Sequence, residues 1–337
     1  MSVKVLENLF GITPEQTIQD GSSVRYMVDN SLYTIIQVTH LEQEALIELY
    51  EMSEHMAKYG DNKVSTFVPG LNEKFLVTHE KQDYVLMHNY LFPPSRNNNT
   101  GRKLAKFHER GKLIQAPISG ANRVGQWKSY WIKRLEQIEN VWRGVVQERT
   151  GEEFEKLFIQ SFPYYLGLCE NAIQYVTDTE LDEELTFLDM GTICHQTFHE
   201  NVWNKQMEIR NPFDWVFDHP SRDIAEWVRD CYFLNSRSFQ PDLTQFFRGY
   251  ESISPLSIFS WRLVYARLLF PLHYFSCIED YYLTSSQWTQ KQLEERLSRY
   301  LRDARDYERF LGNFYQLAGV GQENFPAIDW LVPSYLE

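Results

Sequence analysis

Residues 189–223 read DMGTICHQTFHENVWNKQMEIRNPFDWVFDHPSRD, and they concentrate histidine, carboxylate and amide side chains in a short span. These groups fall into three clusters, which are HQTFHEN at 195–201, FDW at 213–215 and DIA at 223–225. Side chains of these types supply bases, metal ligands and helix caps in proteins. The flanking sequence indicates which fold presents them.

The first ninety residues carry strand patterns around one helix. Ser23–Val28 and Ser31–Val38 flank the dipeptide Asp29-Asn30, which suits a tight turn, so they predict an antiparallel hairpin. Residues 41–58 repeat apolar side chains at helical spacing, so a helix follows. Two more strands are predicted after this helix, at Phe75–Thr78 and Tyr84–His88. The expected order is strands, helix, strands.

Most of the remaining chain has helical spacing. A polar stretch with two prolines and three asparagines, Phe92–Gly101, is the clearest break in composition. We therefore expect a β-rich N-lobe at residues 1–90 and a helical C-lobe at 91–337, which is an α+β fold. Pro163 and Pro271 are expected to kink or break their helices. The predicted helices are Arg102–Arg110, Trp127–Val146, Glu152–Val176, Arg222–Leu234 and the helical stretch Ser257–Thr284.

Charge and composition exclude several classes of function. The chain has 33 basic and 46 acidic residues and a net charge of −13, which disfavours nucleic acid or anionic lipid as the main partner. Its four scattered cysteines favour reduced thiols and a cytosolic compartment. The amino terminus lacks the pattern of a secretory signal. The most apolar stretch, Phe259–Leu283, carries charged residues and a proline, so we expect a buried helix and no membrane span.

Several landmarks in this order resemble the aminoglycoside phosphotransferase and choline kinase superfamily. That family carries H-G-D-x-H-x-x-N, a short hairpin, I-D-W/F and then D-L/I-A. The first motif falls on residues 195–201, the second on Phe213–Trp215 and the third on Asp223–Ala225, while Gly101–His108 is similar to its "LA-x-FH" helix. Within the superfamily the chain most resembles the kinase-like spore-coat proteins of bacilli. The resemblance implies a bilobal protein-kinase-like fold.

The resemblance also implies a role for each position, because phosphoryl transfer depends mainly on positioning and on charge neutralisation. In the family an aspartate of the catalytic loop orients the substrate hydroxyl, and a lysine on the third strand grips the nucleotide phosphates. By position, Asn201 and Asp214 match the two magnesium ligands. His195 is expected to be structural.

The departures from this pattern indicate impaired catalysis. Thr197 occupies the place of the catalytic aspartate, and a threonine hydroxyl is not a base at neutral pH. Loss of a positioned general base forfeits about 10²- to 10⁴-fold in rate. No lysine occurs between Val5 and Ala57, so the strand Ser31–Val38 cannot supply the phosphate grip, and Gln37 or Ile36 stands in its place. Neither carries a positive charge.

Other interpretations of the same residues stay open. Asn201 can be a loop-stabilising amide and Asp214 a cap, while His199 or Glu200 can serve as a substitute base, although solvated loop side chains are commoner. We expect the metal-site remnant to be structural, with Asp214 as a buried anchor. Asp223 resembles the family aspartate that caps the next helix and braces the catalytic loop.

Three functions remain in comparison. We expect a pseudokinase with a role in sporulation, which binds or assembles other spore-coat proteins and binds neither nucleic acid nor membrane. It would lie in the cytoplasm of the mother cell, with the spore coat implied by resemblance. No cofactor is required in this interpretation, and residual binding of magnesium and ATP stays open. The alternatives are an ATP-dependent kinase of homoserine, choline or aminoglycosides with an atypical site, and a ligand sensor without turnover.

Overall fold

The computed structural model describes residues 3–20, 23–91, 99–148, 151–199, 202–203 and 208–331. The chain forms two compact units. Unit 1 comprises Met1–Arg123, Gly191–Asp223 and Gly249–Ser254, and unit 2 comprises Val124–Met190, Ile224–Arg248 and Pro255–Glu337. Unit 1 thus joins the first ninety residues to the segment around the three motifs. The lobe boundary after Tyr90 stays a prediction.

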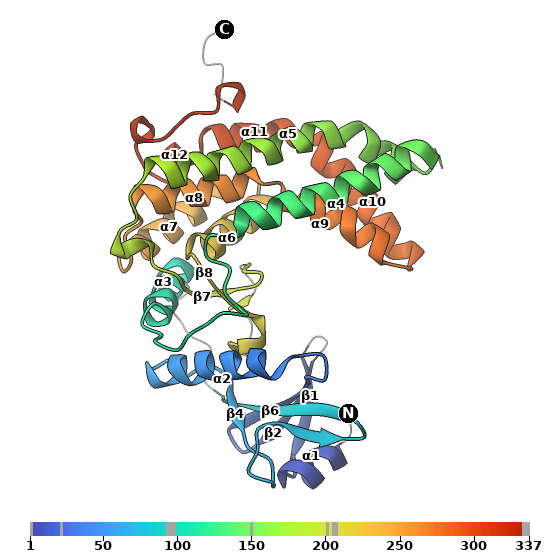
Figure 1. Ribbon diagram of the computed structural model, residues 1–337, viewed down its shortest axis with the longest axis vertical. Helices are drawn as coiled ribbons and strands as arrows, with labels where there is room; N and C mark the ends of the chain where they lie inside the picture. Colours follow the sequence, from blue (N-terminus) through green and yellow to red (C-terminus); the bar gives the residue numbers. More distant parts are fainter. Residues whose placement is uncertain are drawn as a thin grey trace. The chain divides into compact units, whose positions relative to one another are not determined.

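Unit 1 contains an antiparallel sheet of six strands in the order β1-β2-β3-β6-β4, with β5 paired to β6 (Figure 1). The predicted hairpin is confirmed, because β2 and β3 pair with Val28 opposite Ser31. Asp29 takes the left-handed conformation in the turn, with φ at 51°. The strands are β1 Gln16–Asp20, β2 Ser23–Val28, β3 Ser31–Gln37, β4 Thr66–Val68, β5 Val77–His79 and β6 Gln82–Tyr90.

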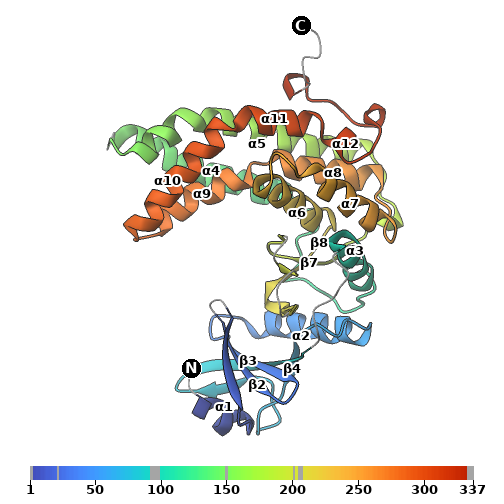
Figure 2. The same ribbon diagram turned by 180° about the vertical axis from the view of Figure 1, so that it is seen from behind.

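Two helices cover opposite faces of this sheet (Figures 1 and 2). Helix α1, Val3–Phe10, places Leu6 and Phe10 in a core cluster with side chains from β2, β5 and β6. Helix α2, Gln43–Lys58, buries Met52 and Met56 on the other side. Because side chains alternate along a strand, Tyr33 and Ile35 of β3 face the α1 cluster. The intervening residues of β3 therefore face away from it.

Glu48 of α2 fastens the segment that follows helix α3, Thr100–Gly111. Its carboxylate accepts hydrogen bonds from the backbone N–H groups of Ser119, Gly120 and Ala121, each at 2.8 Å. Burial works to raise the pKa of Glu48, but these hydrogen bonds outweigh it and lower the pKa. The carboxylate therefore stays ionised and bound to this segment at neutral pH.

A short hairpin in unit 1 carries the first two motifs. It pairs β7, Thr192–His195, with β8, Trp215–Asp218, so that His195 lies opposite Trp215. Helix α3 packs closely on β7, and a Cβ at Gly111 would lie 2.4 Å from Thr192 Oγ1 and 2.7 Å from the Ile193 nitrogen. Only glycine allows this approach without a shift.

Unit 2 is helical, as predicted. Helix α6 begins in unit 1 and continues into unit 2. The stretch 257–284 is two helices, because the chain breaks at Phe270 and Pro271, whereas α5 continues through Pro163. The helices are α4 Trp127–Glu148, α5 Glu153–Asp182, α6 Ser221–Leu234, α7 Gln240–Glu251, α8 Ile258–Leu269, α9 Leu272–Leu283, α10 Gln287–Arg302, α11 Ala304–Gly312 and α12 Phe314–Leu317.

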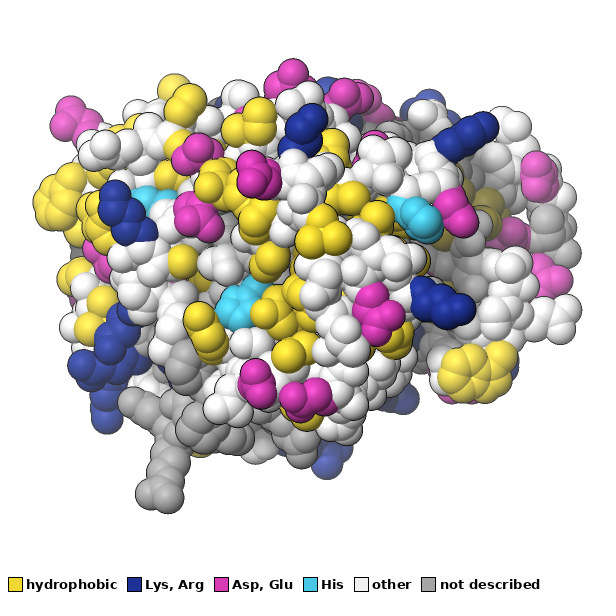
Figure 3. Space-filling view, turned by 90° about the horizontal axis from the view of Figure 1, so that it is seen from below, with side chains coloured by type: hydrophobic (Ala, Val, Ile, Leu, Met, Phe, Trp, Pro, Cys, Tyr) yellow, Lys and Arg dark blue, Asp and Glu magenta, His cyan; other side chains and the backbone are white. Residues whose placement is uncertain are grey.

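The described helices and surface side chains can be compared with those of proteins that bind membranes or nucleic acids. None of them is both long enough and apolar enough to cross a bilayer. On the face shown in Figure 3, the coloured acidic and basic side chains are scattered among hydrophobic and polar ones. This face therefore shows no basic stripe among its described side chains of the kind that tracks a phosphate backbone.

Candidate functional site

Asp223, in the first turn of α6, is the centre of the candidate site. Its side chain is fully buried, and it accepts hydrogen bonds from the His195 backbone nitrogen at 2.9 Å and from His195 Nδ1 at 2.7 Å. Burial works to raise the pKa of Asp223, but the interactions with His195 and His108 hold it well below its usual range. Asp223 is thus an ionised anchor for the start of the catalytic-loop motif. The expectation that it braces this loop agrees with these contacts.

His108 supplies the second contact to this carboxylate. It ends the "LA-x-FH" segment of α3, and its Nε2 lies 3.2 Å from Asp223 Oδ2. Burial lowers the pKa of His108 despite the nearby carboxylate, so the ring is neutral at pH 7. A neutral ring that donates from Nε2 accepts at Nδ1, where the Tyr250 hydroxyl lies at 2.8 Å. Burial raises the pKa of Tyr250 well above its ordinary value, so this hydroxyl keeps its proton.

Arg222 braces the loop from the outside. Its Nε donates to the carbonyl of His195 at 2.9 Å, and its Nη2 donates to the carbonyl of Gln196 at 3.0 Å. Its remaining terminal nitrogen, Nη1, lies 3.0 Å from Asp218 Oδ2. Two residues without an assigned role in the sequence, Arg222 and Asp218, therefore fix the backbone just before Thr197.

An aromatic cluster fills the interior behind the loop. The His195 ring lies 4.8 Å from Phe198 and 5.0 Å from Phe107, centroid to centroid. Arg210 lies 4.1 Å from the centroid of Trp203 and pairs with Asp61. This packing gives His195 a structural place, and its Nε2 is buried without a hydrogen bond among the described residues.

Thr197 occupies the position of the catalytic aspartate and is exposed to solvent. Its predecessor Gln196 donates its backbone N–H to the carbonyl of Asp214 at 2.7 Å. The loop and the FDW motif are therefore bonded side by side, as the motif order implies. Between His195 and His199 the chain carries no carboxylate. Glu200 and Asn201 lie outside the described residues, so their predicted roles stay predictions.

Asp214 ends the short helix η3, Pro212–Asp214, and its side chain is exposed. The expectation of a buried anchor is therefore wrong. The reason is local, since Asn211 caps this turn by accepting from the Phe213 nitrogen at 3.3 Å, and the neighbouring Trp215 takes the buried position. An exposed carboxylate suits one oxygen ligand of magnesium. The predicted pair of ligands cannot be completed from the described residues, because Asn201 is not among them.

A hollow of about 390 Å³ in unit 1 opens beside β2, β3 and η3. Its lining residues are Ser23, Val24, Arg25, Tyr26, Thr34, Ile35, Ile36, Gln37, Ser65, Met87, Asn211 and Phe213. Thr34 and Ile36 alternate with the residues that face the α1 cluster, so their side chains point to the other face of the sheet. Gln37 lies on the same face of β3 as Tyr33 and Ile35. Ile36 is therefore the predicted replacement for the phosphate-binding lysine that lies on the opposite face.

Arg25 is the residue of this hollow that the sequence analysis missed. It lies on β2 directly opposite Thr34 of β3, and its Nη1 donates to the Thr34 hydroxyl at 3.0 Å. Its Nε donates to Asp20 Oδ2 at 2.7 Å, and both side chains are largely buried. The hollow therefore contains a guanidinium whose charge is balanced by a neighbouring carboxylate. Strand register could have found it, because Arg25 and Thr34 are symmetric about the predicted turn.

One group in unit 1 resembles a metal site in its composition. Ligand atoms of His108, Cys194 and Asp223 lie within 4.8 Å of one another, and all three residues are buried. Hydrogen bonds already explain this proximity, since both histidines bind the carboxylate and Cys194 Sγ lies 3.6 Å from the carbonyl of Asp218. We therefore interpret the group as the anchor of the loop and not as a metal centre.

Comparison with known proteins agrees with this geometry. Residues 3–314 match the family described as "Spore coat putative kinase YutH". The endospore coat-associated protein YutH of Bacillus subtilis (strain 168) is 40% identical over 310 residues, which cover 91% of this chain and 91% of that protein.

Two solved structures with the same fold are phosphotransferases. An aminoglycoside phosphotransferase from Alicyclobacillus acidocaldarius subsp. acidocaldarius DSM 446 has a TM-score of 0.68 and 15% identity, over 95% of this chain and 97% of that one. A spectinomycin phosphotransferase in complex with ADP and spectinomycin has a TM-score of 0.57 and 12% identity, over 88% and 92%. At these identities the likeness shows the fold alone. It confirms the predicted kinase-like α+β fold.

Proposed function

Because this chain belongs to the family described as "Spore coat putative kinase YutH", we propose that it is a kinase-like protein of the spore coat that binds partners and does not transfer phosphate. The family match confirms the predicted resemblance to the kinase-like spore-coat branch. The absence of catalysis is our own inference from the site.

Thr197 carries this proposal. The anchor around Asp223 is complete, and the loop it holds presents a threonine where the family presents an aspartate. A threonine hydroxyl is not itself a base and does not accept the proton of a substrate alcohol at neutral pH. His195 does not replace the base, because its Nδ1 is bound to Asp223 and its ring is buried.

The phosphate grip is the second support. Ile36 brings no charge to the hollow, and the guanidinium of Arg25 is held by Asp20. An arginine that already pairs with a carboxylate offers phosphate less net attraction than a free lysine does, since the bound acid repels the same phosphate. We therefore expect weak nucleotide binding.

The coat location rests on the relative. The Bacillus subtilis protein is named as endospore coat-associated, and its likeness covers 91% of both chains. We propose the same association for this chain, with other coat proteins as its partners and synthesis in the mother-cell cytoplasm. A fluorescent fusion at the native locus tests this location, and a signal that stays diffuse in the mother cell through coat assembly would contradict it.

A phosphotransfer assay tests the lack of activity. Purified protein with labelled ATP and magnesium should give no transfer to choline, homoserine or an aminoglycoside above the background without protein. Ordinary kinases turn over at about 1–100 s⁻¹, so even a 10⁴-fold loss of rate would be detectable in a long incubation. Any transfer above that background would refute the proposal.

Arg25 favours a second candidate, a protein that binds nucleotide without turnover. The guanidinium lines the hollow, and the exposed Asp214 carries the type of oxygen ligand that magnesium takes. Asp20→Asn would release Arg25 from its ion pair, so under this candidate it should increase the thermal shift produced by magnesium and ATP. If neither the unmodified protein nor Asp20→Asn is stabilised by ATP, the sensor interpretation fails and the binding-module proposal stands.

A further inference from the structure

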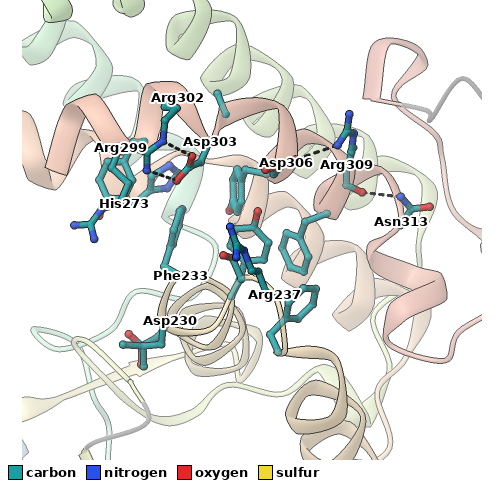
Figure 4. Close-up of a pocket in the computed structure, with 18 of the residues that line it drawn as sticks. Asp230, Phe233, Arg237, His273, Arg299, Arg302, Asp303, Asp306, Arg309 and Asn313 are labelled. Atoms are coloured by element: carbon teal, nitrogen blue, oxygen red, sulfur yellow. Dashed lines mark hydrogen bonds and ion pairs between the residues drawn. The ribbon is translucent and has the colours of Figure 1, made fainter. Parts of the chain in front are cut away.

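A second and larger hollow lies in unit 2, away from every motif of the phosphotransferase resemblance. Its volume is about 1050 Å³, at the upper end of the range of roughly 300–1,000 Å³ for ligand pockets. Side chains from α5, α6, α9, α10 and α11 line it, together with the segment between α6 and α7 (Figure 4). Nothing in the kinase-like interpretation assigns it a role.

Aromatic rings form one wall of this pocket. The centroid of the His273 ring lies 4.6 Å from that of Phe233 and 4.9 Å from that of Tyr300, and Phe233 stacks on Tyr307 at 5.2 Å. Burial, with the nearby charge of Arg229, holds the pKa of His273 well below its ordinary value. This ring is therefore uncharged at neutral pH, and the wall can accept the face of another ring.

Arginines form part of the rim of this pocket. Two of them form ion pairs with neighbouring aspartates. Arg302 Nε donates to Asp303 Oδ1 at 2.9 Å, and Arg309 Nη1 donates to Asp306 Oδ1 at 3.1 Å. Arg237 precedes α7 and lies near the centre of Figure 4, and Arg299 lies on α10 beside His273. Both are exposed, and neither makes a side-chain hydrogen bond or an ion pair with any residue that the structure describes.

The two unpaired arginines, Arg237 and Arg299, both influence the carboxylate of Asp303 electrostatically. Asp303 is paired with Arg302, and the charges of Arg299 and Arg237 also help to lower its pKa. Four arginines and three aspartates line the pocket, so its lining carries one more positive than negative charge in a chain whose net charge is −13. An unpaired surface arginine is common, but a group of them over an aromatic wall and a pocket of this size is the arrangement that binds an anion attached to a ring.

We propose that the pocket of unit 2 binds a small molecule that joins an aromatic ring to carboxylate or phosphate groups. The ring lies against Phe233, His273 and Tyr300. The acidic groups lie at the rim, where Arg237 and Arg299 donate to them. A phosphate or a pair of carboxylates matches the planar fork of a guanidinium, which donates two parallel hydrogen bonds. The site is independent of the hollow beside Arg25, so its test does not depend on whether unit 1 binds nucleotide.

Three probes separate the contribution of the ring from that of the charge. Phenyl phosphate carries both, inorganic phosphate carries the charge alone, and phenol carries the ring alone. Binding is measured by saturation-transfer NMR and calorimetry on the full chain at about 50 mM salt, where exposed charges are weakly screened. Phenyl phosphate should bind at least about tenfold more tightly than either single-feature probe, which corresponds to about 1.4 kcal/mol.

Matched variants locate the site. The double variant Arg237→Ala/Arg299→Ala should weaken phenyl phosphate binding roughly tenfold or more, because the charged hydrogen bonds to the ligand are lost. Both side chains are exposed, so the variant should still fold. Arg305→Ala, a substitution of an exposed arginine of α11 outside the pocket lining, should leave binding unchanged. Phe233→Leu should reduce the preference for phenyl phosphate over inorganic phosphate.

Two outcomes would overturn the proposal. One is the absence of saturable phenyl phosphate binding by the folded protein. The other is binding that Arg305→Ala weakens as much per charge removed as the double variant does, because it would then follow overall charge and not this pocket. Circular dichroism of each variant confirms the fold before binding is compared.

Discussion

The buried support of the catalytic-loop motif and its exposed tip differ in how closely they follow the phosphotransferase pattern. In the support, Asp223 binds both His195 and His108. The hydroxyl of Tyr250 is hydrogen-bonded to His108, and Arg222 donates to the loop backbone. At the tip, Thr197 replaces the aspartate. The chain therefore has the residues that position the loop, whereas the residue at the place of the catalytic aspartate is a threonine.

This difference has a physical reason. Removal of one partner from a buried charged network leaves the others unpaired and costs several kcal/mol, whereas an exposed side chain can change at little cost in stability. A protein that no longer needs the reaction would still need the network to fold. The contrast between support and tip thus fits a fold retained for binding.

The largest effect should follow from Asp223→Ala. This substitution leaves two buried histidines and one backbone N–H without their acceptor, so we expect a loss of about 3–5 kcal/mol in the free energy of unfolding. Urea unfolding followed by circular dichroism measures it. Asp223→Asn, which retains one acceptor oxygen, should lose less. A loss below about 1 kcal/mol in the alanine variant would show that the support is not the stabilising element we describe.

Acid should weaken the support next. The folded-state pKa of His108 lies below about 6.5, the value of an unfolded histidine. As the pH falls, His108 is therefore protonated in the unfolded chain before it is protonated in the folded chain. Stability is complete above pH 6.5 and falls as the pH drops, by at most about 1.4 kcal/mol per pH unit for each such histidine. His273 in unit 2 contributes with the same sign.

Unfolding curves between pH 7.5 and pH 5 check this slope. His273→Phe removes one of the two contributions, so the curve of this variant should be shallower, and the slope that remains includes the contribution of His108. Stability that is flat or rising toward pH 5.5 would contradict the neutral, buried state of these rings.

Asp214→Asn tests the tip and should have a small effect. The carboxylate is exposed, so we expect a change within about 0.5 kcal/mol in the free energy of unfolding. If magnesium and ATP bind through Asp214, the same variant loses the ATP-dependent thermal shift while its stability without ligand is retained. A cost of several kcal/mol would instead restore the interpretation of Asp214 as an anchor.

Thr197→Asp should have the smallest effect. We expect this variant to show no phosphotransfer activity. The substitution returns the carboxylate to the loop, but Ile36 still faces the hollow and Arg25 is still paired with Asp20. The phosphotransfer assay described above measures the outcome, with Thr197→Asn as the uncharged control. Robust turnover in the aspartate variant alone would show that another residue compensates for the missing lysine.

Much of the fold could be predicted from short-range patterns. The hairpin at Asp29-Asn30, helix α2 and the helices α3 to α6 follow from turn chemistry and helical spacing. The structure places them within two residues of their predicted bounds, except that α5 continues to Asp182, beyond its predicted end at Val176. The short strands β1 and β4 were missed. A three-residue strand such as β4 has no period to detect, because its position is set by pairing with β6.

The site divides in the same way. Thr197, Asp214 and Asp223 could be placed by motif spacing, because each lies in a short motif whose order along the chain matches the family pattern. Tyr250 could not, since it reaches His108 from 142 positions away in the chain. The burial of each side chain was equally out of reach, and the error at Asp214 arose there.

The contact between Glu48 and residues 119–121 has a consequence for proteolysis. The segment between α3 and α4 has the composition of an exposed linker that a protease would cut first. However, one carboxylate holds three successive N–H groups of it, and Arg123 donates its N–H to the carbonyl of Phe217 at 2.7 Å. A protease must draw several residues into an extended form, which would break all of these bonds together. Limited digestion should therefore spare this segment, and Glu48→Gln should open it to cleavage while the protein still folds.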